Sequence, residues 1–561
     1  MYSLRGKRGA EHLATLLPIS ALFLLFLVAT VTTLRKSSPK TSELHIQKHM
    51  QVAESLCDGT LYPELCVSTL STIPDLTSKS LPYILSATVN HTIREVRSSE
   101  SNCSSILNSR TYLDERQRRA LDDCIELLDN TVSELLASVA DLAASKHYYH
   151  DLQTLFSAAI TNQYTCLDGF AYSEKKEIRN SIEDRMYEIG HLVSNSLAML
   201  KKLPRAQKRA RRAPEVFSEY GGMEGGFPEW VSRKDRRLLQ TAANQTKYNA
   251  VVAKDGSGHF TTVAAAVEAA PNMSSKRYVI YIKAGAYLEN VEVGRKKTML
   301  MFVGDGIEKT VIKASRNVFD GWTTFRSATV AVVGNGFIAK GISIENTAGP
   351  SKHQAVALRS GSDLSAFYQC RFVGYQDTLY AHSNRQFYRD CDVYGTVDFV
   401  FGNAAVVLQN CNLYARKPNE NQKNIFTAQG REDPNQNTGI SILNSKVAAA
   451  ADLIPVQSSF KTYLGRPWKL YSRTVFLRSN IGDLVDPAGW LEWDGKFALS
   501  TLYYGEYMNR GAGSKTSARV TWPGFRVINS STEASKFTVG SFLQGGQWLP
   551  PTGIPYYPGL S

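Results

Sequence analysis

The chain has 561 residues, an apolar content of 43% and a formal net charge of +13. This length excludes a single compact core, so we expect two domains together with processed or connecting segments. From Thr241 onward there are 34 Lys and Arg against 23 Asp and Glu, a local net charge of +11. A basic surface favours a polyanionic partner, which could be nucleic acid, an anionic membrane or an acidic polysaccharide.

Residues 1–40 are predicted to form a signal peptide or a signal anchor. Arg5, Lys7 and Arg8 precede an uncharged stretch, Leu13–Leu34, which has the character of a secretory signal. An uncharged span of about 22 residues is also long enough to act as a transient membrane anchor. Both alternatives direct the rest of the chain into the secretory pathway, so an extracellular acidic polymer is the favoured partner and nucleic acid is not expected. Five N-x-S/T sequons agree with secretion and are predicted glycosylation sites: Asn90, Asn102, Asn244, Asn272 and Asn529.

Residues 41–203 are predicted to form an all-α domain. The segment RQRRALDDCIELLDNTVSELLASVADLAA repeats apolar residues at steps of three and four and contains no Gly or Pro. In an oxidising compartment cysteines usually pair, but the sequence leaves their connectivity open. An odd number leaves one unpaired among the five of this region: Cys57, Cys66, Cys103, Cys124 and Cys166.

Residues 204–240 are predicted to be a linker. The basic KKLPRAQKRARRAPE enters it, the Gly-rich GGMEGGFPEW follows, and SRKDRRLLQ ends it at Gln240. Exposed basic runs in a secreted chain are candidate protease sites. We therefore expect proteolytic processing here rather than a linker that is only solvated.

Residues 241–561 are predicted to form an all-β domain, because short β-branched and aromatic runs alternate with Gly and Asn. Three segments align on their cysteines, at spacings of 21 and 20 residues: CRFVGYQD from Cys370, CDVYGTVD from Cys391 and CNLYARKP from Cys411. A period near 20 with strand-like units predicts the coils of a parallel β-helix, in which equivalent positions stack about 4.8 Å apart. Cys370 and Cys391 would then form a disulfide or stack as buried thiols.

Asp377 and Asp398 each lie seven residues after an aligned cysteine, so the repeat predicts that they stack on adjacent coils. Two carboxylates about 5 Å apart cannot easily both ionise, so one holds a proton while the other stays anionic. Such a pair suits glycoside hydrolysis with retention. It equally suits ester cleavage through an acyl-carboxylate intermediate.

Neighbouring polar residues favour ester cleavage over glycoside hydrolysis. Gln354 and Gln376 can donate amide N–H groups to an oxyanion, which a cationic glycosidase transition state does not need. Arg466 can hold one carboxylate in a two-pronged geometry and keep it ionised, and Trp468 can stack on a sugar face. Neither a serine-hydrolase elbow nor a His-based metal motif is recognisable, so no metal and no cofactor are expected.

Several motifs in the C-terminal part resemble those of plant pectin methylesterases (pectinesterases). They span most of residues 245–555 in the family's order: GAYLE, QAVALR, GYQDTLY, GTVDFVFG, LGRPW and WLEWDGKFALSTLYYGEY. Residues 45–200 resemble the helical pectin methylesterase and invertase inhibitor domain through LCDGTLYPELCVSTL and LFSAAITNQYTCLDGF. The resemblance implies a right-handed parallel β-helix catalytic domain, preceded by an all-α four-helix-bundle pro-domain.

The resemblance also implies a role for each matched residue. Asp398 would be the nucleophile on a galacturonate methyl ester, and Asp377 the acid and then the base. Gln354 and Gln376 would stabilise the oxyanion, and Arg466 would keep Asp398 anionic. Substrate contacts would come from Thr324, Gln354, Arg466, Trp468 and Tyr380. The products would be methanol and pectate from methylesterified cell-wall pectin (homogalacturonan), with blockwise and random de-esterification both left open.

Further implications concern maturation and partners. Family disulfides would join Cys57 to Cys66 and Cys124 to Cys166, which leaves Cys103 over. A subtilisin-type protease would cut at Arg236, Arg237, Leu238 and Leu239, and a proteinaceous pectinesterase inhibitor would be a further partner in the extracellular cell wall. Two other functions remain open at this point: a pectin-binding or inhibitor protein without catalysis, and a galacturonan-cleaving β-helix enzyme.

Overall fold

The computed structural model describes residues 39–109, 113–144, 149–173, 176–203, 223–224, 227–228 and 248–560. The stretch Leu13–Leu34, the sequon at Asn244 and the expected processing site at residues 236–239 lie outside the described residues. No helix in the described ranges is both long and apolar enough to cross a bilayer. The chain forms two compact units, one of residues 1–59 and 63–80 and one of residues 60–62 and 81–561. The predicted domain boundaries stay a prediction.

The first unit contains two helices, α2 (Pro39–Cys57) and α3 (Pro63–Ser71), followed by the 3-10 turn η1 (Leu76–Ser78). A disulfide between Cys57 and Cys66 joins the end of α2 to α3. Both cysteines are buried. A cross-link restricts the unfolded chain, which helps a unit that has little apolar interior of its own.

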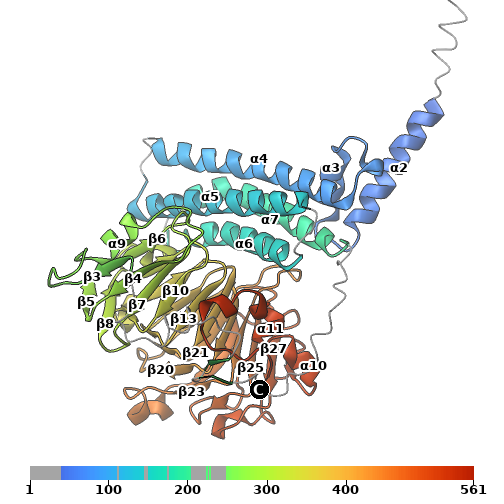
Figure 1. Cartoon of the computed structure of the whole chain (residues 1–561). Coiled ribbons are helices and arrows are strands. Elements are labelled where there is room, and N and C mark those ends of the chain that lie inside the picture. Colours follow the sequence, from blue (N-terminus) through green and yellow to red (C-terminus); the bar gives the residue numbers. More distant parts are fainter. Residues whose placement is uncertain are drawn as a thin grey trace, which may run out of the picture. The chain divides into compact units, whose positions relative to one another are not determined.

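The second unit begins with a closed bundle of four helices: α4 (Leu81–Asn108), α5 (Glu115–Ala143), α6 (Tyr149–Asp168) and α7 (Glu177–Leu200). Each helix packs against the next, and α7 packs against α4 (Figure 1). The start of α5 is fixed by a capping box, in which Gln117 N donates to Asp114 Oδ1 at 2.7 Å and Gln117 Oε1 accepts from Asp114 N at 3.2 Å. A disulfide between Cys124 and Cys166 joins α5 to α6, and Cys103 stays a buried free thiol.

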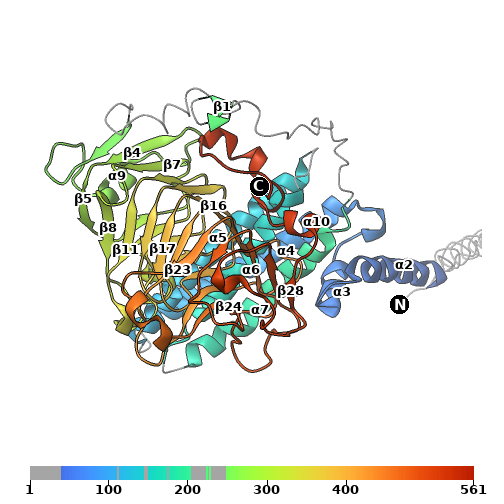
Figure 2. The ribbon, with the colours of Figure 1, turned by 90° about the horizontal axis from the view of Figure 1, so that it is seen from below.

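The rest of the second unit is a parallel β-helix with three sheets, whose successive coils lie side by side (Figure 2). Every strand pair within these sheets is parallel. The first sheet contains β3 (Ala250–Val252), β4 (Tyr278–Ile282), β7 (Leu300–Gly304), β10 (Ile338–Lys340), β13 (Ser365–Tyr368), β16 (Arg385–Arg389), β19 (Ala405–Gln409), β22 (Gly439–Leu443), β25 (Arg473–Leu477), β27 (Tyr503–Tyr507) and β28 (Phe525–Val527).

The two other sheets complete each coil. The second contains β5 (Gly285–Leu288), β8 (Thr310–Ala314), β11 (Ser343–Asn346), β14 (Arg371–Val373), β17 (Asp392–Gly395), β20 (Asn412–Ala415), β23 (Lys446–Ala449) and β26 (Asn480–Ile481). The third contains β6 (Val291–Val293), β9 (Val330–Val332), β12 (Leu358–Ser360), β15 (Leu379–Ala381), β18 (Val400–Gly402), β21 (Asn424–Gln429) and β24 (Thr462–Pro467). Shorter elements are α9 (Val263–Ala269), α10 (Ser531–Ser535), α11 (Val539–Phe542) and the antiparallel pair β1 (Met223–Glu224) and β2 (Phe227–Pro228).

The interior of the β-helix consists of ladders of buried apolar side chains. Phe367 on β13 pairs in register with Tyr388 on β16, and their rings stack with centroids 4.6 Å apart. The ladder continues through Leu408, Ile442 and Phe476 on the next coils. This continuous core holds the strand ends of each coil at fixed positions, which lets side chains on the outside of the third sheet form a site.

The cysteine repeat gives the register of the coils as expected. Arg371, Asp392 and Asn412 pair across β14, β17 and β20, so the cysteines directly before them stack. Cys370, Cys391 and Cys411 are all buried and free. The disulfide alternative for Cys370 and Cys391 is therefore wrong for this structure, because both residues point into the apolar interior as thiols. The Sγ of Cys391 lies 3.4 Å from the Phe367 carbonyl oxygen and 3.3 Å from that of Arg389.

The described sequons lie on different kinds of structure. Asn90 is exposed and Asn102 is half-buried, both on α4, whereas Asn272 and Asn529 are exposed outside helices and strands. Glycosylation at these positions stays a prediction.

Candidate active site

Asp377 and Asp398 each lie two residues before the first residue of a strand of the third sheet, β15 and β18 respectively. Leu379 pairs with Val400 in the parallel register, so the two aspartates occupy the same position on adjacent coils. Their backbones have φ of 64° and 52°, the left-handed region that Asp adopts more readily than most residues. The stacked arrangement agrees with the repeat in the sequence.

Arg466 on β24 holds Asp398 in a two-pronged ion pair. Its Nε donates to Oδ1 at 2.9 Å and its Nη2 donates to Oδ2 at 2.6 Å. Burial raises the pKa of the Asp398 carboxyl, and the Arg466 charge and hydrogen bonds act against that rise. Burial, followed by the charge of Asp398, raises the pKa of Asp377 well above its ordinary value. The two carboxyls therefore have different surroundings: the charge and hydrogen bonds of Arg466 favour the ionised form of Asp398, whereas burial and the charge of Asp398 favour the protonated form of Asp377.

Both carboxylates open into a pocket of about 340 Å³ on the outside of the third sheet. All eight residues that the sequence nominated line this pocket: Thr324, Gln354, Gln376, Asp377, Tyr380, Asp398, Arg466 and Trp468. Residues from five different coils thus meet at one place, because the parallel register stacks the ends of their strands.

Aromatic side chains form one wall of the pocket. Tyr380 stacks on Phe401 with ring centroids 4.2 Å apart, and the Trp468 ring lies 6.0 Å from that of Phe401. The Trp493 ring lies 4.3 Å from the guanidinium carbon of Arg466, a cation–π contact that covers the ion pair. Flat apolar faces beside hydrogen-bonding groups suit a sugar ring.

The sequence analysis did not nominate nine of the residues that line the pocket: Thr165, Asp168, Gly169, Ala171, Tyr172, Phe325, Phe401, Ala428 and Trp493. Phe401 lies within the GTVDFVFG motif and Trp493 within WLEWDG, so both motifs could have pointed to them. Phe325 directly follows Thr324 and could have been included with it. Tyr172 belongs to the helical region and has no recognisable motif.

The helical region supplies part of the pocket lining. The cavity that Asp377 and Asp398 line is bordered by five residues of this region: Thr165, Asp168, Gly169, Ala171 and Tyr172. The amide of Gln354 donates to the Tyr172 hydroxyl. The Tyr172 hydroxyl of the helical region thus binds a side chain of the β-helix inside the pocket.

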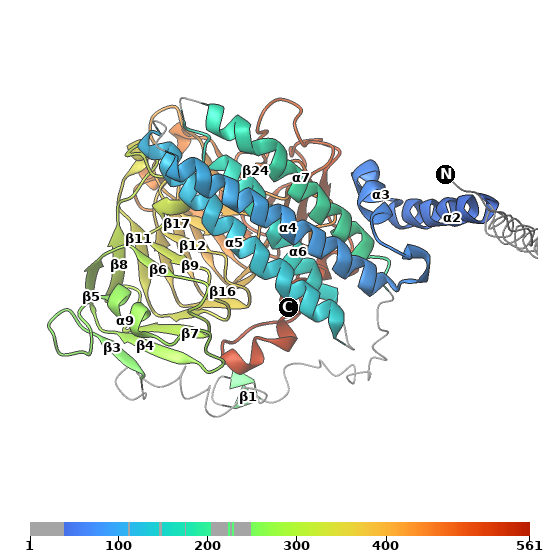
Figure 3. The ribbon, with the colours of Figure 1, turned by 90° about the horizontal axis from the view of Figure 1, so that it is seen from above.

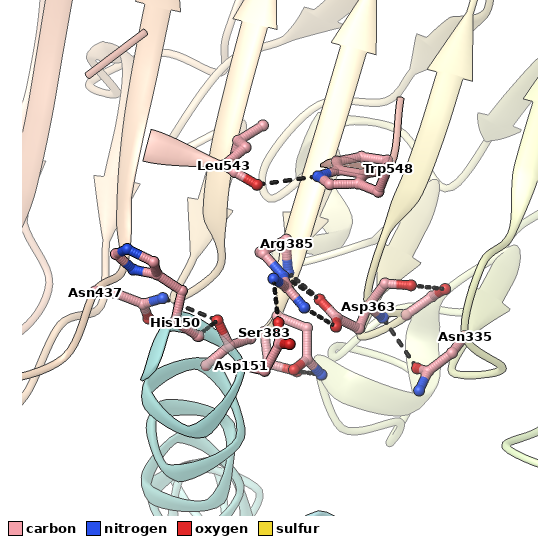
Figure 4. Close-up of polar contacts among 12 residues, drawn as sticks. His150, Asp151, Asn335, Asp363, Ser383, Arg385, Asn437, Leu543 and Trp548 are labelled. Carbon is pink, nitrogen blue, oxygen red and sulfur yellow. Dashed lines mark hydrogen bonds and ion pairs between the residues drawn. The ribbon is translucent and has the colours of Figure 1, made fainter. Parts of the chain in front are cut away.

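Figure 3 shows the four helices of the bundle in front of the β-helix, and further polar contacts join the two. Figure 4 shows Arg385 on β16 between Asp363 and Asp151, the latter on the first turn of α6. Arg385 Nη1 donates to Asp151 at 2.7 Å, and its Nη2 donates to Asp363 at 2.6 Å. On the other side, Lys469 Nζ lies 3.2 Å from Asp168 at the end of α6.

Metal binding has no candidate residues among the described parts of the chain, since no three His, Cys, Asp or Glu side chains gather in a suitable arrangement there. The ionisable and amide side chains that line the pocket are three carboxyls, one arginine and two amides: Asp168, Asp377, Asp398, Arg466, Gln354 and Gln376.

The fold and the site define a class: a parallel β-helix hydrolase with a paired-carboxylate centre. Residues 249–546 match the family described as Pectinesterase, and residues 51–199 match the family described as Plant invertase/pectin methylesterase inhibitor. The chain belongs to the pectinesterase family, and it combines the catalytic domain with an inhibitor domain. It is a pectin methylesterase, a carboxylic ester hydrolase, and the binding-only alternative is not favoured.

Individual relatives agree along nearly the whole chain. Pectinesterase 1 of Citrus sinensis is 52% identical over 546 residues, 95% of this chain and 92% of that protein. Pectinesterase/pectinesterase inhibitor 3 of Arabidopsis thaliana is 48% identical over 573 residues, 97% of this chain and 96% of that protein. Among solved structures, the pectin methylesterase from carrot is 63% identical, with a TM-score of 0.56, and 56% of this chain covers 99% of that chain.

Proposed function

We propose that Asp398 is the nucleophile and Asp377 the acid and base of methyl ester hydrolysis on galacturonate units of pectin. The Asp398 carboxylate attacks the ester carbonyl carbon, and the carbonyl oxygen becomes an oxyanion that accepts from the side-chain amides of Gln354 and Gln376. Collapse breaks the bond to the methoxy oxygen while Asp377 gives it a proton, so methanol leaves and an acyl-aspartate anhydride remains.

The second half of the reaction restores the enzyme. Asp377, now anionic, takes a proton from water as the water oxygen attacks the acyl carbon. The bond to Asp398 breaks, its carboxylate returns to the Arg466 fork, and a galacturonic acid group is released on the polymer. Trp468, Tyr380 and Thr324 contact the sugar chain on either side of the reacting ester.

One observation carries this assignment: the two stacked carboxylates have opposite electrostatic surroundings. Asp398 is held by Arg466 at 2.6 and 2.9 Å, which favours its anionic form. Asp377 faces Asp398 in a buried site, and its raised pKa favours the protonated form. An anionic nucleophile beside a protonated acid is the pair that acyl transfer to a carboxylate requires.

The test is methanol release from highly methylesterified pectin by residues 241–561, with viscosity followed in the same tube. Asp398→Ala should lower methanol release by a factor of about 10⁴ or more. Falling viscosity would instead indicate cleavage of the polymer chain, and methanol release by Asp398→Ala at the wild-type rate would overturn the assignment. Because this part alone matches 99% of the carrot chain and encloses its own core, it is expected to fold by itself.

Secretion and latency complete the proposal. The N-terminal stretch and the exposed sequons support export to the cell wall, where homogalacturonan is the substrate. The bundle lines one side of the pocket and engages Gln354 through Tyr172, which supports a latent precursor that a subtilisin-type protease activates by cutting at Arg236–Leu239. A separate proteinaceous inhibitor would bind the face that the bundle leaves after cleavage.

Latency is tested by comparing the uncleaved chain with residues 241–561 at equal molar concentration. The shorter protein should be the more active, since substrate does not compete with Tyr172 there. Equal activity of the two would leave the helical region with a role in folding or retention only.

A further inference from the structure

The start of α5 contacts a loop of the β-helix, residues 317–322, which is called the Trp322 loop here. Arg119 Nη1 donates to the Gly321 carbonyl oxygen at 2.9 Å. The guanidinium carbon of Arg119 lies 4.0 Å from the centroid of the Trp322 ring, which is a cation–π contact. A flat aromatic face beside a carbonyl acceptor matches the planar shape and the N–H donors of a guanidinium group.

A second arginine, one helical turn before Arg119, extends this contact. Arg116 Nη2 donates to the Phe319 carbonyl oxygen at 3.1 Å. Residues three positions apart lie on the same side of a helix, so both guanidinium groups reach the same loop. All four partners in these two hydrogen bonds line a cavity of about 670 Å³. The contacts therefore lie beside free space and not inside the packed core.

The Trp322 loop is held in shape by bonds within the β-helix. Asn317 is 1% exposed, and its side-chain amide bonds to Asp320 twice. Asn317 Nδ2 donates to Asp320 Oδ2 at 2.7 Å, and Asn317 Oδ1 accepts from the Asp320 backbone N–H at 2.8 Å. The Trp322 backbone N–H donates to the Asn317 carbonyl oxygen at 3.2 Å. Because these bonds do not involve α5, we expect the loop to keep its shape in residues 241–561. A preformed site binds its partner at a lower entropic cost.

The charges around the Trp322 ring favour a partner that carries an acidic residue beside its arginines. The guanidinium carbon of Arg316, on the β-helix, lies 4.1 Å from the centroid of the same ring, so its charge repels that of Arg119. Glu115 Oε1 lies 3.1 Å from Arg119 Nη2 and offsets part of this repulsion. The pattern on α5 is thus an acidic residue followed by arginines one and four positions later: Glu115, Arg116 and Arg119.

We propose that the Trp322 loop is a recognition site for arginine side chains. In residues 241–561 it takes two arginines, one turn apart, on a helix of a separate inhibitor protein. The proposal rests on the proposed function, because it names the feature by which the released domain selects among helical inhibitors. An anionic polymer would meet the negative ends of two carbonyl dipoles at this loop, so a cationic protein partner is favoured over the substrate.

The test uses the helical region of this chain as the probe, released by cutting the folded full-length protein at a protease site inserted in residues 204–240. Titration calorimetry measures the dissociation constant of the probe with residues 241–561. Arg119→Ala in the probe should weaken binding about tenfold, since a cation–π contact and a charge-assisted hydrogen bond are lost. Arg118→Ala is the matched control, because Arg118 is the neighbouring arginine and is exposed; binding should change by less than about twofold.

The role of the Trp322 ring is tested in residues 241–561. In Trp322→Leu, the difference between the wild-type probe and the Arg119→Ala probe should shrink from about tenfold to about threefold or less, because the two substitutions remove the same contact. Trp322→Phe should restore part of the difference. Phe497→Ala should leave it unchanged, since Phe497 is 39% exposed and lines neither the cavity beside the loop nor the pocket of Asp377 and Asp398.

Three results would overturn the site: equal losses for Arg119→Ala and Arg118→Ala, a difference that persists in Trp322→Leu, or a wild-type probe that does not bind. Calorimetry needs no catalysis, so the site and the proposed function can fail separately. The expected pattern of binding without methanol release would retain the site and reject the reaction. Methanol release together with equal losses for the two arginine variants would retain the reaction and reject the site.

Discussion

Asp123 and Glu126 of α5 contact Thr323, Arg326 and Arg359 of the β-helix, and these five residues are called the α5 docking face. The pocket of Asp377 and Asp398 and the α5 docking face each contain a buried aspartate that accepts a hydrogen bond from an arginine Nε. The distance is 2.9 Å for Asp398 with Arg466 and 2.8 Å for Asp123 with Arg326. Burial is the largest influence on both carboxyls and raises the pKa of each, to about 6 for Asp123. The local chemistry of the two pairs is therefore similar.

The two aspartate–arginine pairs differ in how the fold connects the aspartate to the arginine. Asp398 immediately precedes the short segment that leads into β18, and Arg466 lies on β24 of the same sheet, with β21 between the two strands in parallel register. Asp123 and Arg326 lie on opposite sides of the linker and meet only while the bundle rests on the β-helix. Under the proposed function we expect the first pair to remain when the helical region is removed, because both partners belong to the β-helix. The second pair would be lost, because Asp123 belongs to the removed region.

The largest expected effect of a substitution is in the pocket, at Gln354. In residues 241–561, Gln354→Ala should lower kcat by a factor of about 10² to 10³, because one oxyanion donor is lost. KM should change much less, since the contact strengthens in the transition state. Steady-state methanol release measures both constants.

Gln457→Ala serves as the control for that substitution, since Gln457 bonds to Asp483 at 3.2 Å in an exposed position. A similar fall in kcat for both variants would argue against a specific role of Gln354 in the pocket.

The next largest effect is a gain of activity, and it is expected from a substitution in the α5 docking face. Asp123→Asn in the uncut chain should raise methanol release, because docking loses about 2 kcal/mol of charge-assisted hydrogen bonding, near 30-fold in the docking equilibrium. Activity of the uncut variant relative to residues 241–561 is the quantity to measure.

Asp122→Asn is the matched control, since Asp122 is the neighbouring carboxylate and is exposed. If Asp122→Asn activates as strongly as Asp123→Asn, the charge of the helix and not the pairing with Arg326 controls latency.

The smallest effect is a dependence of latency on pH. Glu134 on α5 borders a cavity of about 100 Å³, where burial raises its pKa from 4.5 to about 8. The Glu134 carboxylate accepts a hydrogen bond from Asn162 Nδ2 at 3.0 Å. Asn384 and Arg295 lower the pKa of Glu134, and the charge of Asp363 raises it further. A raised pKa means that docking favours the protonated form. The contribution of Glu134 to docking is therefore fully present below about pH 4.5 and is lost as the pH rises through about 8.

The measurement is the activity of the uncut chain divided by that of residues 241–561 between pH 5 and pH 8, a ratio that removes the pH dependence of catalysis itself. We expect the ratio to increase with pH by a few-fold. Glu134→Gln should flatten the curve, whereas Glu188→Gln, an exposed site on α7, should not. A flat curve in the wild type would exclude Glu134 as the responsible group.

Much of the β-helix could be predicted from the sequence, because its order is repeated along the chain. Cys370, Cys391 and Cys411 mark the coil period, and the observed register of β14, β17 and β20 follows that period. The positions of Asp377 and Asp398 follow from the same count. A repeat converts a sequence separation directly into a spatial neighbour, so no tertiary information was needed for this pair.

Other features had no such local rule. The state of Cys370 and Cys391 depends on the direction in which their side chains point, and the sequence left a disulfide and two thiols equally open. Trp493 covers Arg466 from a segment beyond the last strand of the third sheet, at no fixed spacing from the other pocket residues. Their positions depend on packing between distant parts of the chain, which a local pattern does not specify.

The sequence by itself determined the helical and β-helical regions, the coil period and the stacked carboxylates, since each of these rests on periodicity or on a motif within a short stretch. Only the tertiary structure decided that Tyr172 reaches Gln354 and that Asp123 meets Arg326, contacts that span 182 and 203 residues. Such contacts arise when two separately patterned surfaces match in shape and charge, and neither pattern alone contains its partner.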